Sequence, residues 1–340
     1  MRCCSRMVRA TAVVAALAVI SLQPVAPIAA QSDIPSVNVA TYGKGAGEWC
    51  MYIAQQKGYF DQAKVKIGQW LVVFGDPNIV NALVSGQVDM AVSSTGAILP
   101  VANGQTDQVV AIGGSESYPV SLVAADTITS PSQLVGKTIS MPPKNTSLEI
   151  IGTRQIDNLI GAGKWSAIYL GGADDTHLPL IGAGKVQGVL VNDPVTLEPD
   201  SHLHIIARLN GGQAMFNGPL MASKKFLQTN PQAAIRFLAA FAKGCNFILD
   251  PKNKAEAVNI LSSATGVAHE SSEAFYDFYV AGPQRGKTPP KDARIDSAGF
   301  ANTIQAMKDA GVITNKAFDP KSVIDNSYLD QALKLAATIH

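Results

Sequence analysis

The chain has 340 residues, of which 47% are hydrophobic and 16% charged, and its formal net charge at pH 7 is +1. This near-neutral balance gives no electrostatic reason to bind nucleic acid or an anionic membrane. The length exceeds what a single hydrophobic core usually supports, so we expect two lobes.

The first 30 residues have the pattern of a cleaved secretory signal. A basic start is followed by an apolar run over 12–22, and the segment ends in Ile28-Ala29-Ala30, an acceptable cleavage site. The run is shorter than the roughly 20 apolar residues of a transmembrane helix. No cysteine follows the cleavage site directly, as attachment of a lipid would require. We therefore expect residues 1–30 to be a signal peptide and the mature protein to be periplasmic, without a membrane anchor.

Cys50 and Cys245 are the cysteines that lie beyond the predicted signal. An oxidising compartment would permit a disulfide between them, but two positions in a sequence fix no geometry. Cys245 shares an apolar helical stripe with Phe241 and Leu249, which is also typical of a buried free thiol. The sequence leaves both alternatives open, and two buried thiols are the simpler interpretation.

Short β-branched runs alternate with helical stretches through the first two thirds of the chain, which predicts an α/β fold with a largely parallel sheet. The predicted strands are 37–42, 65–74, 89–92, 109–112, 133–139 (with its leading turn), 168–170, 189–191 and 204–209. The predicted helices between them are 47–57, 77–86, 95–102, 147–160 and 176–183.

One sequence pattern occurs twice in this region, at residues 83–92 and again at 181–190. In each copy an apolar residue precedes a glycine, a valine follows the glycine, and an apolar run comes next. The pattern is typical of a helix end, a left-handed glycine and a buried strand. Two copies predict two similar α/β lobes with a ligand cleft between them.

Helical patterns dominate from residue 218 to the end of the chain. Asn230-Pro231 is a capping and first-turn signal for a long helix. The predicted helices are 231–249, 252–263, 271–280, 297–310 and 326–339. We expect this helical third to pack on the first lobe, because the strand at 204–209 can return the chain there.

Four segments of the chain, in family order, resemble the SsuA/TauA and NMT1/THI5-like family of periplasmic substrate-binding proteins of ABC transporters. These segments are Trp49-Cys50-Met51-Tyr52-Ile53-Ala54-Gln55-Gln56-Lys57-Gly58-Tyr59-Phe60, Ala82-Leu83-Val84-Ser85-Gly86-Gln87-Val88-Asp89, Leu134-Val135-Gly136-Lys137-Thr138-Ile139 and Phe226-Leu227-Gln228-Thr229-Asn230-Pro231. The resemblance extends from about Val37 to Leu335. One departure is Gln187, where relatives often carry an acidic residue after the Gly-x-Val unit.

The resemblance implies an α/β, two-lobed type II periplasmic binding fold with two crossover segments and a helical C-terminal third. The expected domains are a signal peptide over 1–30, lobe 1 over 31–122 plus 219–340, and lobe 2 over 123–218. The implied function is that of a monomeric receptor, which closes on a small polar organic molecule, aromatic or anionic, and delivers it to an ABC permease.

Candidate ligand-binding residues follow from the rule that ligands of open α/β sheets sit at the carboxyl ends of strands, near helix N-termini. In lobe 1 the rule selects Tyr42, Glu48, Trp49, Phe74, Ser94, Thr95 and Tyr118. In lobe 2 it selects Asn145, Thr146, Asn192 and Asp193.

Each candidate also has an ordinary structural interpretation. Ser94 and Thr95 could hold an anion at a helix start, or they could simply cap that helix. Thr146 begins a capping box with Glu149, whose carboxylate weakens an anion site in lobe 2. Asp193 precedes a proline and is equally typical of an Asx turn.

The aromatic candidates could form walls for a planar ligand, whereas Trp49, at helical spacing from Tyr52 and Ile53, equally fits a core position. Glu48 could bind an amine or a ring N–H, although a solvated acid in the first helical turn is commoner. Arg208 could be a counter-ion at the return crossover or an exposed strand residue.

The sequence lacks the marks of an enzyme: we find no Gly-x-Ser-x-Gly, His-Glu-x-x-His or Cys-x-x-Cys motif. The 5 histidines are scattered, so we expect no metal site and no cofactor. One alternative is a sulfonate or nitrate receptor of the same fold. The other is an exported THI5-like pyrimidine-related enzyme, although the cysteine-rich motif of eukaryotic THI5-type proteins is missing here.

Overall fold

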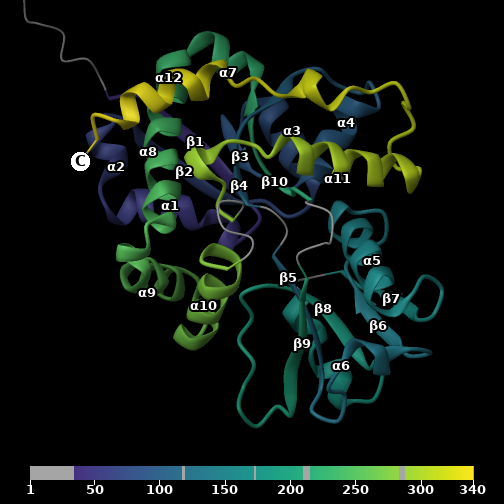
Figure 1. Ribbon diagram of the computed structural model, residues 1–340. Helices are drawn as coiled ribbons and strands as arrows, with labels where there is room; N and C mark the ends of the chain where they lie inside the picture. Colours follow the sequence, from purple (N-terminus) through teal and green to yellow (C-terminus); the bar gives the residue numbers. More distant parts are fainter. Residues whose placement is uncertain (1–33, 117–118, 172–173, 210–214, 283–287, 340) are drawn as a thin grey trace, which may run out of the picture. The chain divides into compact units, whose positions relative to one another are not determined.

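The computed structural model describes residues 34–116, 119–171, 174–209, 215–282 and 288–339, drawn as ribbons in Figure 1. The predicted signal peptide and the candidate residue Tyr118 lie outside these ranges. Residues 34–340 form one compact unit.

The first sheet has the strand order β2-β1-β3-β10-β4. Its strands are β1 (Ser36–Thr41), β2 (Lys66–Val72), β3 (Met90–Val92), β4 (Val109–Glu116) and β10 (Gly218–Ser223). β1 pairs in parallel with β2 and β3, whereas β10 runs antiparallel between β3 and β4. The sequence pattern predicted all of these strands except β10, whose six residues are all buried and show no polar alternation.

Alternate residues of the first sheet face two different helical layers. Val39 belongs to a hydrophobic cluster with residues of α1 (Trp49–Gln56) and α8 (Pro231–Leu249). Its neighbour Ala40 belongs to a second cluster with residues of α3 (Asp76–Ser85) and α11 (Ser297–Asp309). The sheet is therefore covered on both faces, as a largely parallel sheet requires.

The second sheet has the order β7-β6-β8-β5-β9, in which β6 pairs in parallel with β7 and β8. Its strands are β5 (Val120–Ala125), β6 (Thr138–Met141), β7 (Ser166–Tyr169), β8 (Gly188–Asn192) and β9 (Leu203–Leu209). The helices of this region are α5 (Ser147–Ile160) and α6 (Pro179–Gly182). The chain passes to the second sheet between Glu116 and Val120, and it returns to the first between Leu209 and Gly218.

The repeated sequence pattern lies at equivalent positions of the two sheets, where a helix is followed by a strand. Asp89 directly precedes β3, and its Oδ2 accepts a hydrogen bond of 2.8 Å from the backbone N–H of Asn38 on β1. Gln187 directly precedes β8, and its Oε1 accepts a bond of 3.2 Å from the backbone N–H of Thr138 on β6. The amide oxygen of Gln187 thus serves the same strand-pairing role as the carboxylate of Asp89.

The helical C-terminal third packs largely on the first lobe, as the sequence predicts (Figure 1). Apart from α8 and α11, its main helices are α9 (Lys254–Thr265), α10 (His269–Phe275), which continues into a π-helical turn (Tyr276–Val280), and α12 (Ser327–Ala336). Three short helices complete the main elements of the first lobe: α2 (Tyr59–Gln62), α4 (Leu99–Ala102) and α7 (Lys224–Thr229). In the described part of the chain, no helix combines the length and apolar character needed to cross a membrane.

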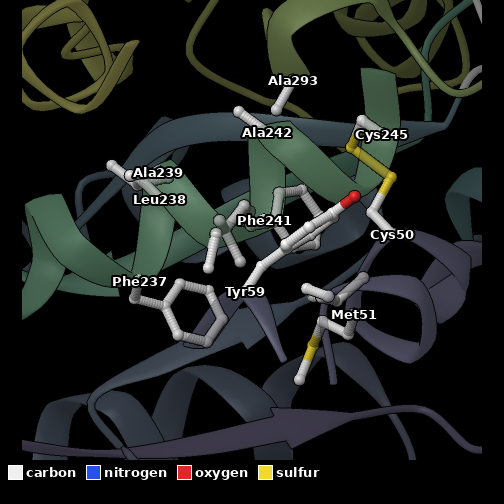
Figure 2. Close-up of a cluster of buried hydrophobic side chains, with 14 of the residues drawn as sticks. Cys50, Met51, Tyr59, Phe237, Leu238, Ala239, Phe241, Ala242, Cys245 and Ala293 are labelled. Carbon is white, nitrogen blue, oxygen red and sulfur yellow. A yellow bond between two sulfur atoms is a disulfide. The ribbon is translucent and has the colours of Figure 1, made fainter. Parts of the chain in front are cut away.

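A disulfide joins α1 to α8, which settles the alternative that the sequence left open. Cys50 and Cys245 are bonded with their Cα atoms 4.6 Å apart, as the yellow bond in Figure 2 shows. The helices approach closely because residue 244 is glycine: a Cβ atom there would lie 2.2 Å from the carbonyl oxygen of Cys50. The simpler interpretation of two free thiols is therefore wrong.

Removing this disulfide should destabilise the fold. We expect the double variant Cys50→Ala/Cys245→Ala to lose about 2–5 kcal/mol of unfolding free energy, because the bridge closes a long loop in the unfolded chain. Urea unfolding without reductant measures the loss. Reductant should weaken the wild type and leave the double variant unchanged; a reductant effect on the variant would contradict this assignment.

Trp49 should also be a stability residue. It is 1% exposed, its indole N–H donates to the carbonyl oxygen of Ala257 at 3.0 Å, and its ring lies 5.9 Å from that of Phe275. We expect Trp49→Ala to cost about 3–5 kcal/mol by chemical denaturation. The control is Phe74→Ala, because Phe74 is 70% exposed and its loss should change stability by less than about 0.5 kcal/mol. Equal losses in the two variants would contradict the assignment.

Candidate functional site

Polar side chains from the ends of both sheets meet in one hydrogen-bonded cluster. Ser94 follows β3, Ser147 begins α5 behind β6, and Asn217 precedes β10. The hydroxyls of Ser94 and Ser147 are 3.1 Å apart, and that of Ser147 donates to Oδ1 of Asn217 at 3.0 Å. The backbone N–H of Thr95 donates to the same oxygen at 3.2 Å. The cluster therefore links lobe 1, lobe 2 and the return crossover.

Within this cluster, Ser94 and Thr95 use their side chains as the capping interpretation expects. The Ser94 hydroxyl accepts the backbone N–H of Gly96 at 3.0 Å and donates to Oδ1 of Asp76 at 2.6 Å. The Thr95 hydroxyl donates to the carbonyl oxygen of Phe216 at 2.9 Å. Both hydroxyl protons already have acceptors in the protein, and one of these acceptors is a carboxyl group.

Asp76 is a site residue that the candidate set omits. It is the first residue of α3 and follows β2, so the strand-end rule reaches it as well. The hydroxyl of Tyr42, which follows β1, also donates to its Oδ1. Burial raises the pKa of Asp76 to about 6, and the bond from Ser94 opposes that rise. The close fit requires glycine at position 96, where a Cβ atom would lie 1.9 Å from Oδ2 of Asp76.

Two further carboxyl groups, those of Glu48 and Glu116, lie near each other in lobe 1. Glu48 is 5% exposed, and its Oε2 accepts the backbone N–H of Gly45 at 3.0 Å. Glu116 ends β4, and its carboxyl lies over Gly47, where a Cβ atom would be 3.4 Å from Oε1. Burial raises the pKa of each group to about 8, and Glu116 adds to the rise at Glu48. The protonated form of both carboxyl groups is therefore favoured more than it is in water.

Glu116 is absent from the candidate set because the predicted strand stops at residue 112. The observed strand continues through Gly113 and Gly114, residues that usually weaken a strand. A Cβ atom at Gly114 would lie 2.6 Å from the Phe216 ring, so packing explains that glycine. Extending the strand across the glycines is the one sequence signal that reaches Glu116.

The aromatic candidates do not come together. Trp49 lies in the core of lobe 1, whereas Phe74 is largely exposed at the end of β2. Tyr42 is half-buried and bonded to Asp76, and Tyr118 lies outside the described residues. Tyr42 is the one aromatic candidate among the described residues that joins the polar cluster.

In lobe 2, Asn145 and Thr146 shape the start of α5. Asn145 is exposed with a left-handed φ of 68°, and its backbone N–H donates to Oε2 of Glu149 at 3.0 Å. The Thr146 hydroxyl accepts the backbone N–H of Glu149 at 3.2 Å and donates to the carbonyl oxygen of Pro143. Thr146 therefore has the expected capping role, and its hydroxyl proton is already donated to the carbonyl oxygen of Pro143.

Asn192 and Asp193 differ in exposure at the end of β8. Asn192 is exposed, whereas Asp193 is 3% exposed and its Oδ2 accepts a bond of 2.9 Å from Nε of Arg208. Burial raises the pKa of Asp193, and the Arg208 charge opposes that rise. Arg208 is therefore a counter-ion, but its partner is Asp193.

Metal-ligand chemistry is not indicated. Within the described ranges, no group of three or more His, Cys, Asp or Glu side chains could hold a metal ion. The expectation of no metal site rests on the sequence and is not tested by this geometry.

Solved structures of the same architecture resemble this chain. One is the periplasmic nitrate-binding protein NrtA from Synechocystis PCC 6803, with 13% identity, a TM-score of 0.67 and 91% of each chain covered. Another is the periplasmic aliphatic sulphonate binding protein SsuA from Escherichia coli, with 14% identity, a TM-score of 0.63, and 87% of this chain and 99% of that chain covered.

A third is a ligand-binding component of an ABC-type import system from Staphylococcus aureus, solved with zinc bound. Its identity is 11%, its TM-score is 0.67, and 88% of this chain and 99% of that chain are covered. At these identities the likeness establishes the fold, which is the expected two-lobed type II periplasmic binding fold.

Comparison of the sequence with known proteins gives information about the family as well as the fold. No curated protein matches the chain. The family model described as NMT1/THI5 like matches residues 49–255, which is more than half of the chain. The protein therefore belongs to the NMT1/THI5-like family.

Proposed function

We propose that this protein is a periplasmic receptor that closes its two lobes on a small polar organic molecule and delivers it to an ABC permease. Its family and its fold support this function, because the similar structures include binding components for nitrate and aliphatic sulphonate. We further propose that it acts as a monomer, reaches the periplasm through a cleaved signal, and catalyses no reaction.

The observation that carries this proposal is the 3.1 Å contact between the hydroxyl oxygens of Ser94 in lobe 1 and Ser147 in lobe 2. Both hydroxyls lie at strand ends, where ligands of open α/β sheets bind. A solute that contacts both of these edges stabilises the closed form, because it gains its full set of contacts only when the lobes come together. The neutral contact between two hydroxyls is weak enough for a solute to replace it.

The alternative of a sulfonate or nitrate receptor fits the charges of the site less well. Asp76 accepts the Ser94 hydroxyl proton, and lobe 1 adds the carboxyl groups of the buried Glu48 and the partly exposed Glu116. An anion placed there would meet acceptors and acidic groups in lobe 1. Among the described residues, no lysine, arginine or histidine forms an ion pair with any of these three carboxyl groups.

The alternative of an exported enzyme gains no support from the serine–histidine contact in the described residues. A serine and a histidine do meet, since the Ser140 hydroxyl lies 3.1 Å from Nδ1 of His177. Both residues are buried, and Ser140 is 0% exposed on a central strand. A substrate cannot reach that serine, so the pair fits a structural role.

Binding of a small solute should raise the thermal midpoint. We expect purified protein to respond to at least one class in a panel of sulfonates, nitrate, pyrimidines, aromatic acids and organic amines. A solute present at 100 times its Kd stabilises the native state by about 2.7 kcal/mol. Differential scanning fluorimetry measures the shift, and a panel without any response would count against the receptor function.

The link between the lobes predicts a specific binding defect. We expect Ser147→Ala to weaken binding of the solute found in the panel about fivefold, because the variant loses a hydroxyl that lies where the lobes meet and that can hydrogen-bond the solute. Ser322→Ala is the control, since that hydroxyl is exposed and donates within its own turn to Asp319. Isothermal titration calorimetry gives both affinities. An unchanged affinity in Ser147→Ala would remove Ser147 from the site.

A further inference from the structure

We propose that the hydroxyl of Tyr279 is the pivot on which the two lobes close. It binds the strand by which the chain enters lobe 2 and the strand by which the chain leaves it, and it holds both strands against lobe 1. Tyr279 is thus a positioning residue, because it acts through the arrangement of the lobes. This role rests on the proposed function, in which the lobes close on a solute.

The Tyr279 hydroxyl contacts both strands at the point where the chain crosses between the sheets. The residue is 2% exposed, and its hydroxyl donates to the carbonyl oxygen of Val120 at 2.9 Å and lies 3.4 Å from that of Leu209. Val120 begins β5 and Leu209 ends β9, and these two residues are partners in the antiparallel pairing of the strands. One hydroxyl therefore meets both strand ends that border the crossovers.

The ring of Tyr279 is anchored in lobe 1. Its centroid lies 4.9 Å from that of Phe275, and the Phe275 ring lies 5.9 Å from that of Trp49 on α1. All three side chains belong to the hydrophobic cluster that also contains Val39 of the first sheet. The body of the tyrosine is thus part of the lobe 1 core, while its hydroxyl reaches the backbone of lobe 2.

The turn that carries Tyr279 makes a second contact with lobe 2. The Phe278 ring lies 5.9 Å from the guanidinium of Arg208, which precedes Leu209 on β9 and pairs with Asp193. Neighbouring side chains of one turn therefore contact neighbouring residues of one strand. The backbone N–H of Ala281 donates to the carbonyl oxygen of Tyr276 at 2.9 Å, so the turn is π-helical, a rare conformation that recurs at functional sites.

The start of the same helix also contacts lobe 2. Ala268 directly precedes α10, and its backbone N–H donates to the hydroxyl of Thr196 at 2.9 Å. Thr196 follows β8 and lies within the segment assigned to lobe 2. Both ends of the segment from α10 to the π-helical turn are thus bonded to lobe 2, while its aromatic side chains pack in lobe 1.

The position of these bonds distinguishes a pivot from a contact that forms only on closure. The crossovers link the lobes covalently, so the axis of a hinge motion passes close to them. Val120 and Leu209 border the crossovers and move least, whereas Ser94 and Ser147 at the strand ends separate when the lobes open. Because buried carbonyl oxygens need a donor in every state, the Tyr279 hydroxyl keeps its bonds while the lobes rotate.

Distances between spin labels test the pivot without any solute. One label is attached through Asn81→Cys on α3 in lobe 1 and the other through Asn158→Cys on α5 in lobe 2, since both side chains are exposed and the native cysteines are bonded to each other. Double electron–electron resonance gives the distribution of distances. We expect Tyr279→Phe to broaden it at least about 1.4-fold, because a harmonic restraint that loses half of its stiffness doubles the variance of the motion.

Two controls separate a loss of the pivot from a general loosening of the fold. Tyr328→Phe should keep the wild-type width, since the Tyr328 hydroxyl bonds the carbonyl oxygen of Leu227 within lobe 1. A label pair within lobe 1, made with Asn81→Cys and Gln232→Cys, should keep its width in Tyr279→Phe. An unchanged distance distribution between the lobes in Tyr279→Phe, or equal broadening within lobe 1, would overturn the inference.

A second variant decides the matter alone where Tyr279→Phe does not fold. Phe278→Leu removes the ring that meets Arg208 and leaves the Tyr279 hydroxyl in place. We expect a smaller broadening between the same labels, and the wild-type width would overturn the inference. These distances need no solute, so they can contradict the pivot while the receptor function holds, and silence of the solute panel would count against the receptor function alone.

Discussion

The contact between α1 and α8 determines where the chemistry of lobe 1 can lie. The two helices approach closely because Gly244 faces the backbone of Cys50, and the disulfide from Cys50 to Cys245 fixes that contact. Trp49 begins α1 inside the same hydrophobic core, so the residue before it, Glu48, is held at the end of β1. A long C-terminal helix thus fixes an acidic group near the N-terminus of the described chain.

The two lobes make the same contact at equivalent positions, but with different side chains. Asp89 and Gln187 each precede a central strand and each accept a backbone N–H from the neighbouring strand. A carboxylate and an amide oxygen are interchangeable for that purpose, because the N–H requires an acceptor and no charge. Gln187 therefore departs from the family pattern in charge only, because its side chain makes the same type of contact as that of Asp89 in the other lobe. It carries no information about the solute.

Local sequence signals predicted most elements but not the partners of their side chains. The bounds of α5 and α8 agree with the helical patterns, because capping residues and proline mark both starts. β10 was not predicted, because its sequence Gly-Pro-Leu-Met-Ala-Ser does not alternate between apolar and polar residues. Its place between β3 and β4 depends on the return crossover. The positions of Ser94 and Thr95 at a strand end were predictable. Their bonds to Asp76 and Phe216 were not, since those partners come from other elements.

The bonding partners of the side chains, which the sequence does not reveal, also determine which charge the site favours. From sequence, hydroxyls at a helix start favour an anion, because the backbone N–H groups and the dipole of the helix are positive there. In the structure, Ser94 itself accepts the N–H of Gly96, and its own proton faces Asp76. The positive end of the helix is thus already compensated within the protein, so this edge of lobe 1 favours an anion less than the sequence pattern indicates.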